Sequence, residues 1–280
     1  MLKKTFIHIP SIGAKTEQSL WLSGVADWDK FKEPFLNHLP FKKIELIKEY
    51  LNASKEHIKN DNPNYFTDLM QSNLHWRMFP EFRHLAVFLD IETTGLDPID
   101  QTITTIALYN GKSIFYYVKN INLDDFIKDI KQYKVIITYN GKCFDVPFIE
   151  KYFGINMTHA HIDLRYILSG LGFKGGLKAC EKNLGIQRGE LHDIDGYFAI
   201  LLWYDYIKKR NKKALETLLA YNIQDVVNLE KLIIIAYNLR LKETPFFDSL
   251  RLDIPSVPDI PFKADIRTIE RIKNEYTFFY

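Results

Sequence analysis

From His84 onward the chain changes to a series of strand-like runs, and this change restricts its fold more than any other feature. The runs are rich in β-branched and aromatic side chains, which favour strands, and they cover residues 84–92, 101–109 and 112–118. Asn110-Gly111 joins the last two runs. This dipeptide is typical of a hairpin because both positions accept positive φ angles. We therefore predict three consecutive antiparallel strands.

After the hairpin the pattern alternates between helix and strand. A helix is expected over 122–131, a buried strand over 134–139 and a short extended piece over 161–164. Helix predominates in the remainder. A block of antiparallel strands followed by a helix and further strands predicts an α/β fold, with a mixed sheet flanked by helices.

Three regions are expected along the chain. Residues 1–80 carry helical patterning interrupted by prolines, residues 81–245 form the α/β domain, and residues 246–280 form a tail that packs on the core. Within the first region, Pro10-Ser11-Ile12-Gly13 is similar to the hairpin of a helix-hairpin-helix DNA-binding motif. A plain packing turn is the interpretation we favour, because no lysine cluster flanks it tightly.

Composition excludes several classes of protein. The chain has 280 residues, with 37 Lys+Arg against 35 Asp+Glu, so any binding to nucleic acid must use local basic patches. Its two cysteines exclude a disulfide scaffold and a multi-cysteine zinc site. Apolar runs are far shorter than the roughly 20 residues that span a bilayer. The N-terminus lacks the apolar segment of a secretory signal. We expect a cytoplasmic protein without a membrane partner.

Acidic residues mark three points of the predicted domain. Asp90 and Glu92 share one face of a strand, Asp145 lies where a strand gives way to a helix, and Tyr221 stands one helical turn before Asp225. Each has an ordinary alternative: solvated strand-end acids, an N-cap at Asp145, and a surface aspartate. Taken together, the four carboxylates would repel one another unless cations neutralised them. Oxygen ligands suit Mg²⁺ or Mn²⁺ rather than zinc.

These motifs resemble the DEDD exonuclease superfamily, whose members have a ribonuclease H-like fold. The Y-x-x-x-D spacing resembles the DEDDy branch, and the YprB-like ribonuclease H-like domain family is the most similar. The resemblance covers about residues 63–240 and rests on WRMFPEFRHLAVFLDIETTGL, TYNGKCFDVPFIEKYFGI, HIDLRYIL, GGLKACEKNLGI and YNIQDVVNLEKL, in that order. The exonuclease domain of B-family DNA polymerases is also similar around the acidic motifs.

The resemblance implies a role for each matching residue. Asp90 would bridge two Mg²⁺ or Mn²⁺ ions, Glu92 and Asp225 would complete the nucleophile-side site, Asp145 would hold the second ion, and Tyr221 would orient the attacking water. Other residues would contact the substrate or support the motifs: Thr93, Thr94, Gly95, Leu96, Asn140, Phe144 and Lys178.

Two further clusters leave alternatives open. His161 and Asp163 belong to an H-x-H-x-D run, and we favour support of the neighbouring motif over metal ligation because no fourth ligand is evident. A basic cluster is formed by Lys174, Lys178, Lys182 and Arg188. It is either a solvated helix face or a track for a nucleic-acid backbone.

The expected activity is metal-dependent phosphodiester hydrolysis by a two-metal mechanism. A 3′→5′ exonuclease on single-stranded nucleic acid is favoured, with DNA ahead of RNA, releasing nucleoside 5′-monophosphates. The alternatives are a nucleic-acid-binding module without turnover and a structure-specific endonuclease on the same core. The sequence does not indicate any protein partner.

Overall fold

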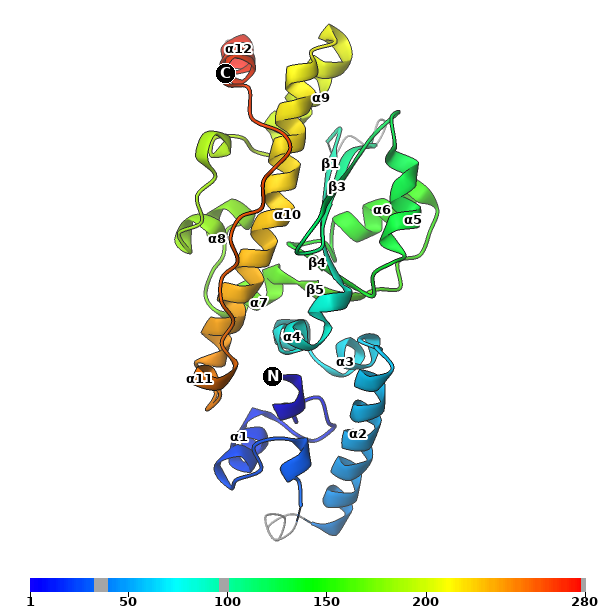
Figure 1. Ribbon diagram of the computed structural model, residues 1–280, viewed down its shortest axis with the longest axis vertical. Coiled ribbons are helices and arrows are strands. Elements are labelled where there is room, and N and C mark those ends of the chain that lie inside the picture. The colour runs from blue at the N-terminus through cyan, green and yellow to red at the C-terminus, as the bar shows by residue number, and fades with distance from the viewer. Residues whose placement is uncertain (33–39, 96–100, 278–280) are drawn as a thin grey trace.

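A five-stranded mixed sheet forms the centre of the computed structural model, which describes residues 1–32, 40–95 and 101–277 (Figure 1). The strands are β1 (Ala86–Thr93), β2 (Ile103–Tyr109), β3 (Ile114–Val118), β4 (Val135–Thr138) and β5 (Ala160–Asp163). Their order across the sheet is β3-β2-β1-β4-β5. β2 pairs with β1 and with β3 in the antiparallel sense, whereas β4 and β5 extend the sheet in parallel from β1. The predicted mixed sheet flanked by helices is confirmed.

The hairpin between β2 and β3 forms where it was predicted, but its turn differs. Gly111 has a φ of 85°, whereas Asn110 is not among the described residues with a positive φ. Instead, the Asn110 side-chain oxygen accepts the backbone N–H groups of Lys112 and Ser113, at 3.0 and 2.8 Å. The Asn110 side chain therefore closes a slightly longer loop than the predicted two-residue turn.

Helices cover both faces of the sheet. On one face, α5 (Phe126–Ile130) and α6 (Asp145–Phe153) pack on an apolar layer that includes Leu89 and Ile91 of β1. The long helix α10 (Lys212–Leu241) crosses β1 and β2 on the other face. Side chains alternate along a strand, so Asp90 and Glu92 share the α10 side of β1 with the buried Phe88. The alternation thus directs both acids toward α10.

The remaining helices lie before, between and after these elements. They are α1 (Ala14–Leu22), α2 (Phe41–Lys59), α3 (Asn64–Leu69), α4 (Phe79–Phe82), α7 (Leu164–Gly170), α8 (Leu177–Asn183), α9 (Gly196–Lys209), α11 (Phe247–Leu250) and α12 (Ile266–Thr277). Single turns of 3₁₀ helix cover Leu2–Lys4, Trp28–Lys30, Arg83–Leu85, Leu123–Asp125 and Gly189–Leu191, and a longer one covers Ser72–Met78.

The N-terminal helices lie below the sheet in Figure 1, and a buried ion pair ties their first segment to the 3₁₀ helix at Ser72–Met78. Arg77 Nη2 lies 2.9 Å from Glu17 Oε2. Glu17 also accepts the Phe6 N–H at 2.6 Å. Ile9 and Ile12, on either side of the turn at Ser11, are both buried. The apolar side chains of this turn therefore pack inward.

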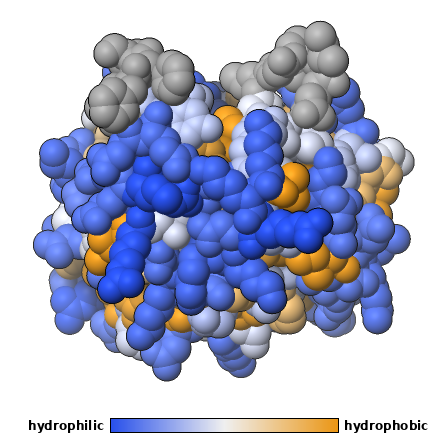
Figure 2. All heavy atoms as spheres, turned by 90° about the horizontal axis from the view of Figure 1, so that it is seen from above, coloured by the Kyte–Doolittle hydropathy of each residue, from blue (hydrophilic) through white to orange (hydrophobic). Residues whose placement is uncertain are grey.

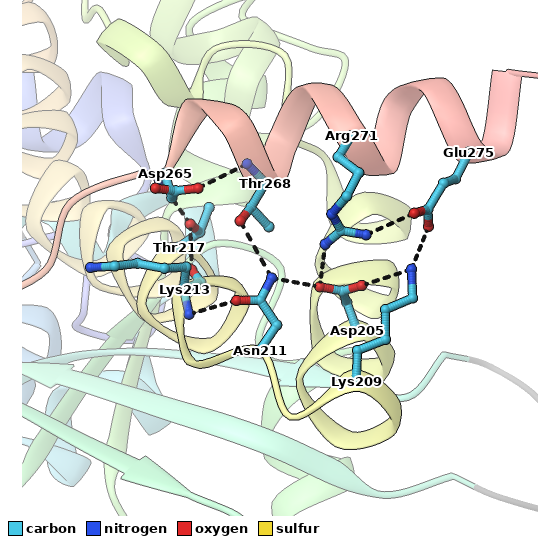
Figure 3. A network of polar contacts seen from close by, with 9 residues as sticks. All are labelled: Asp205, Lys209, Asn211, Lys213, Thr217, Asp265, Thr268, Arg271 and Glu275. Atoms are coloured by element: carbon cyan, nitrogen blue, oxygen red, sulfur yellow. Dashed lines mark hydrogen bonds and ion pairs between the residues drawn. The ribbon is translucent and has the colours of Figure 1, made fainter.

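The C-terminal segment runs beside α10 and ends in α12, which packs near α9 (Figure 1). Ile269 and Ile272 of α12 are buried. Figure 3 shows the polar network beside them, in which buried Asp205 of α9 accepts hydrogen bonds from Arg271 at 2.6 Å and Asn211 at 2.8 Å. Apolar contacts and a buried carboxylate together hold α12 in place.

The outer surface at this end of the molecule is mostly hydrophilic, with separate apolar patches (Figure 2). Among the helices that the structure describes, none is both long and apolar enough to cross a membrane.

Candidate active site

Three carboxylates that are far apart in the sequence meet between β1 and α10. Asp90, Glu92 and Asp225 each offer one oxygen, and these oxygens all lie within 4.8 Å of one another. The strand places the first two on its α10 side, and α10 carries the third across the sheet. An all-oxygen donor set of this kind suits a hard divalent cation such as Mg²⁺ or Mn²⁺.

The acids of this cluster are difficult to ionise without a cation. Burial raises the pKa of Asp90 well above its usual value, and the neighbouring Asp225 and Asp145 raise it further. The pKa of Glu92 rises for the same reasons. Burial also raises the pKa of Asp225, although Arg188 acts in the opposite direction. A bound divalent cation would relieve this repulsion, so the arrangement fits a metal centre.

Asp145 adjoins the cluster from the start of α6. Its Oδ1 accepts the backbone N–H of Ile91 at 3.2 Å, which ties α6 to the middle of the acidic motif. The interpretation of Asp145 as an N-cap is wrong, because Phe144 is the N-cap and Asp145 is the first helical residue. Burial raises the pKa of Asp145 to about 7. Its carboxylate therefore faces β1 instead of capping its own helix.

The turn before Asp145 is held by a buried carboxylate. Asp163 accepts the backbone N–H groups of Asn140, Lys142 and Arg165, at 2.8, 3.1 and 3.0 Å. Asn140 has a φ of 68°. These bonds provide acceptors for backbone N–H groups that find none within the turn.

His161 acts on the same turn through Thr138. His161 Nε2 and Thr138 Oγ1 lie 2.8 Å apart, and Thr138 Oγ1 accepts the Gly141 N–H at 3.0 Å. A Cβ atom on Gly141 would lie 2.3 Å from Thr138 Oγ1, so only glycine fits. The structure places His161 and Asp163 beside the second acidic motif and outside the carboxylate triad.

Asp163→Ala is expected to lower the free energy of unfolding by about 3 kcal/mol, because it leaves three backbone N–H groups, all in partly buried hydrogen bonds, without their acceptor. Urea denaturation measures this loss, with Asp124→Ala, at an exposed aspartate, as the control. A loss no larger than that of the control would show that Asp163 does not hold the turn.

Two cations flank the ring of Tyr221, which is buried one turn before Asp225. Lys178 Nζ lies 4.7 Å from the ring centroid, and Arg188 Cζ lies 5.7 Å from it. Burial and the neighbouring Asp225 raise the pKa of Tyr221, so its hydroxyl stays protonated. The Tyr221 hydroxyl in turn acts to lower the pKa of Asp225.

Arg188 belongs to the site, although the sequence indicated only membership of a basic cluster. It is 6% exposed, its Nη1 lies 2.5 Å from Asp225 Oδ1, and its Nε donates to Glu181. Asn228 donates to the other oxygen of Glu181 at 2.9 Å. A charge run normally suggests solvated side chains, and no sequence signal set this arginine apart.

Asn222 is a second residue that the motifs did not single out. It is fully buried, and its Nδ2 donates to Asp90 Oδ2 at 2.7 Å while its Oδ1 accepts from Thr105 Oγ1 at 3.0 Å. It therefore fixes the Asp90 carboxylate against β2. Its place inside Y-N-I-Q-D, on a helix with an apolar stripe, was a signal that could have identified it.

The remaining predicted residues lie around the cluster. Thr93 ends β1, and Gly95, with a φ of 111°, donates its N–H to Thr93 Oγ1 at 3.2 Å. Thr94 N–H bonds the Thr102 carbonyl at 3.0 Å, and Phe144 packs on Phe148. Leu96 lies outside the described residues.

The sequence-family model that describes the RNase H superfamily matches residues 87–237 of this chain. The chain therefore belongs to this superfamily. Ribonuclease H-like nucleases use divalent metal ions, and the acidic cluster agrees with a nuclease that binds nucleic acid. Among solved structures, the family B DNA polymerase from the hyperthermophilic archaeon Pyrobaculum calidifontis is similar at 18% identity and a TM-score of 0.40. That match covers 56% of this chain and 24% of the polymerase chain. No curated protein matches the sequence.

Proposed function

We propose that this protein is a metal-dependent 3′→5′ exonuclease of the DEDDy type that acts on single-stranded nucleic acid, with DNA favoured over RNA. The observation that carries the proposal is the meeting of Asp90, Glu92 and Asp225, with Tyr221 one turn before Asp225 on the same helix. The order and spacing of the motifs support a place in the YprB-like family. We also propose that residues 81–245 form the nuclease domain, between a helical region (1–80) and a tail (246–280).

Each acidic residue has a task in this mechanism. Asp90, Glu92 and Asp225 would hold the nucleophile-side cation, and Asp145 with Asp90 would hold the second one. Two bound Mg²⁺ or Mn²⁺ ions supply activation of the water and stabilisation of the leaving oxygen. Asn222 keeps the Asp90 carboxylate in one orientation through its 2.7 Å hydrogen bond.

Tyr221 would position the attacking water. Its hydroxyl stays protonated because burial and Asp225 raise its pKa. A protonated phenol can both donate and accept a hydrogen bond, so it can orient a water molecule without taking up its proton. Cations over the Tyr221 ring and the packing of α10 limit the movement of the side chain.

The test uses 5′-labelled single-stranded DNA, duplex DNA and RNA with Mg²⁺ or Mn²⁺. A ladder that shortens from the 3′ end is expected, fastest on single strands, and EDTA should abolish it. Circular single-stranded DNA is the matched control, because an exonuclease needs an end and should leave it intact.

Other outcomes would favour the alternative functions. Cleavage of the circle would indicate an endonuclease on the same core. Absence of cleavage from every substrate, with cation binding shown by calorimetry, would favour a nucleic-acid-binding module.

A further inference from the structure

A cavity of about 580 Å³ lies beside the turn that leads to Asp145, and the proposed function gives it no role yet. One wall is formed by Tyr139, Asn140 and Arg165, at the end of β4 and the start of α7. Phe173 and Lys174, with the two glycines that follow, form a second wall just before α8. Part of the basic cluster seen in the sequence thus belongs to a defined hollow.

Both walls lead directly into the acidic cluster. Asn140 begins the turn whose last residue, Asp145, bonds the Ile91 N–H. The second wall continues from Gly176 to Lys178, whose ammonium lies over the Tyr221 ring. The Tyr139 hydroxyl also lies 3.5 Å from Sγ of Cys180, in the helix that follows this wall. A chain leaving the cluster along this side would enter the cavity.

The cations of the cavity are available to a ligand. Arg165 and Lys174 are exposed, and neither forms an ion pair with a described residue. Arg165 Nη1 donates to the Asn140 side-chain oxygen, which leaves most of its five N–H donors free. The nearby carboxylate of Asp163 is buried and already accepts three backbone N–H groups.

Two further residues of the basic cluster, which lie closer to the carboxylates, have different surroundings. Arg188 is buried against Asp225 and Glu181, and Lys178 is packed on Tyr221. The divalent cations proposed for the acidic cluster would serve the scissile phosphate alone. Phosphates further along the strand therefore need cations outside the cluster, and Arg165 and Lys174 are in position to supply them.

Aromatic side chains add a second kind of contact. Tyr139 and Phe173 are partly exposed and line the same cavity as the two cations. Free cations combined with aromatic rings are the combination by which proteins hold single strands, because phosphates bind the cations and unpaired bases stack on the rings. A base pair would have to open before its bases could reach these rings.

We propose that the strand preceding the scissile phosphate lies in this cavity, with its phosphates on Arg165 and Lys174 and a base against Phe173. This proposal rests on the proposed function and extends it by assigning the preference for a single strand to a particular part of the molecule.

The experiment compares the wild-type protein with Arg165→Gln/Lys174→Gln. Fluorescence anisotropy with a 5′-labelled oligothymidylate, in Ca²⁺ and without turnover, is expected to show a dissociation constant at least about tenfold higher for the double variant. The slope of log affinity against log salt should fall by about 1.4, since each phosphate contact on a single strand contributes roughly 0.7. An oligouridylate should show the same losses, because the contacts are to phosphates and bases.

A substrate without a preceding strand separates the cavity from the acidic cluster. Hydrolysis of the p-nitrophenyl ester of thymidine 5′-monophosphate with Mn²⁺ should be the same in the double variant as in the wild type. Lys208→Gln/Lys212→Gln, which removes two exposed charges elsewhere, is the matched control and should bind the oligonucleotide normally. Phe173→Leu should weaken oligonucleotide binding without changing the salt slope.

Two results would overturn the proposal. One is unchanged oligonucleotide affinity and slope in the double variant. The other is an equal loss of ester hydrolysis, which would mean that the substitutions disturb the acidic cluster. If the wild type binds the oligonucleotide through these residues but hydrolyses neither substrate, the nuclease function fails while the strand site remains.

Discussion

Asp90→Asn is expected to abolish cleavage while making the metal-free protein more stable. Asp90 is the carboxylate that both cations would share, so its loss should reduce turnover by at least about a thousandfold. Asparagine keeps the size of the side chain, and its oxygen can accept the 2.7 Å hydrogen bond that Asn222 Nδ2 now donates to Asp90. The fold should therefore survive the change.

The gain in stability follows from the raised pKa of Asp90. Burial and the neighbouring acids raise it well above the unfolded value, so the folded state retains a proton that the unfolded state has lost. The free energy of unfolding then falls as pH rises from the unfolded pKa through the folded one. A neutral amide removes this contribution, so Asp90→Asn should gain most over the wild type at the alkaline end of that range.

Urea denaturation in EDTA between pH 5 and pH 8 measures this effect, and the oligonucleotide assay measures turnover. Asp124→Asn, at an exposed carboxylate, is the control and should change neither property. Added Mn²⁺ should stabilise the wild type much more than Asp90→Asn. Full cleavage by the variant would remove Asp90 from the mechanism.

Arg188→Met is expected to lower the free energy of unfolding by about 3–5 kcal/mol. The guanidinium is buried between Glu181 and Asp225, and methionine would leave both carboxylates without their cation. Lys182→Met, at an exposed lysine on α8, is the control and should have little effect.

A combined variant distinguishes loss of charge pairing from loss of packing. Arg188→Met combined with Glu181→Gln removes one of the two carboxylate charges that Arg188→Met leaves unpaired. The double variant should therefore regain part of the lost free energy of unfolding, measured by urea denaturation. If the double variant is as unstable as the sum of the single ones, packing around Arg188 dominates and the ion pairs contribute little.

The sheet could be predicted because its strands follow local rules. The β-branched and aromatic content of 84–92 predicted the strand, the alternation of side chains along a strand predicted the shared face of Asp90 and Glu92, and the Asn-Gly pair predicted the hairpin. The details of that turn could not be predicted, since Asn110 adopts a different geometry and closes the loop with its side chain. A dipeptide indicates that a turn forms, but side-chain bonds decide its type.

The carboxylates of the site could be predicted from motif order, whereas their partners could not. The alternative in which Asp145 only caps its helix could not be dismissed from the sequence, because the local sequence does not show that the Ile91 N–H lies within reach. The sequence left Arg188 either on a solvated helix face or on a nucleic-acid track, because its burial depends on contacts with Asp225 of α10 and Glu181 of α8. Contacts between distant segments decide both cases.

The length of α10 has a mechanical consequence. With 30 residues it extends for about 45 Å and contacts the 3₁₀ helix at Ser72–Met78, α7, α9, α11 and α12 as well as the sheet. Asp225 belongs to this helix, whereas Asp90 and Glu92 belong to β1. The distance between Asp225 and the two acids of β1 therefore depends on the spacing between α10 and the sheet. A tilt of α10, wherever along the helix it starts, would change the distances between these three carboxylates, which are the proposed cation ligands.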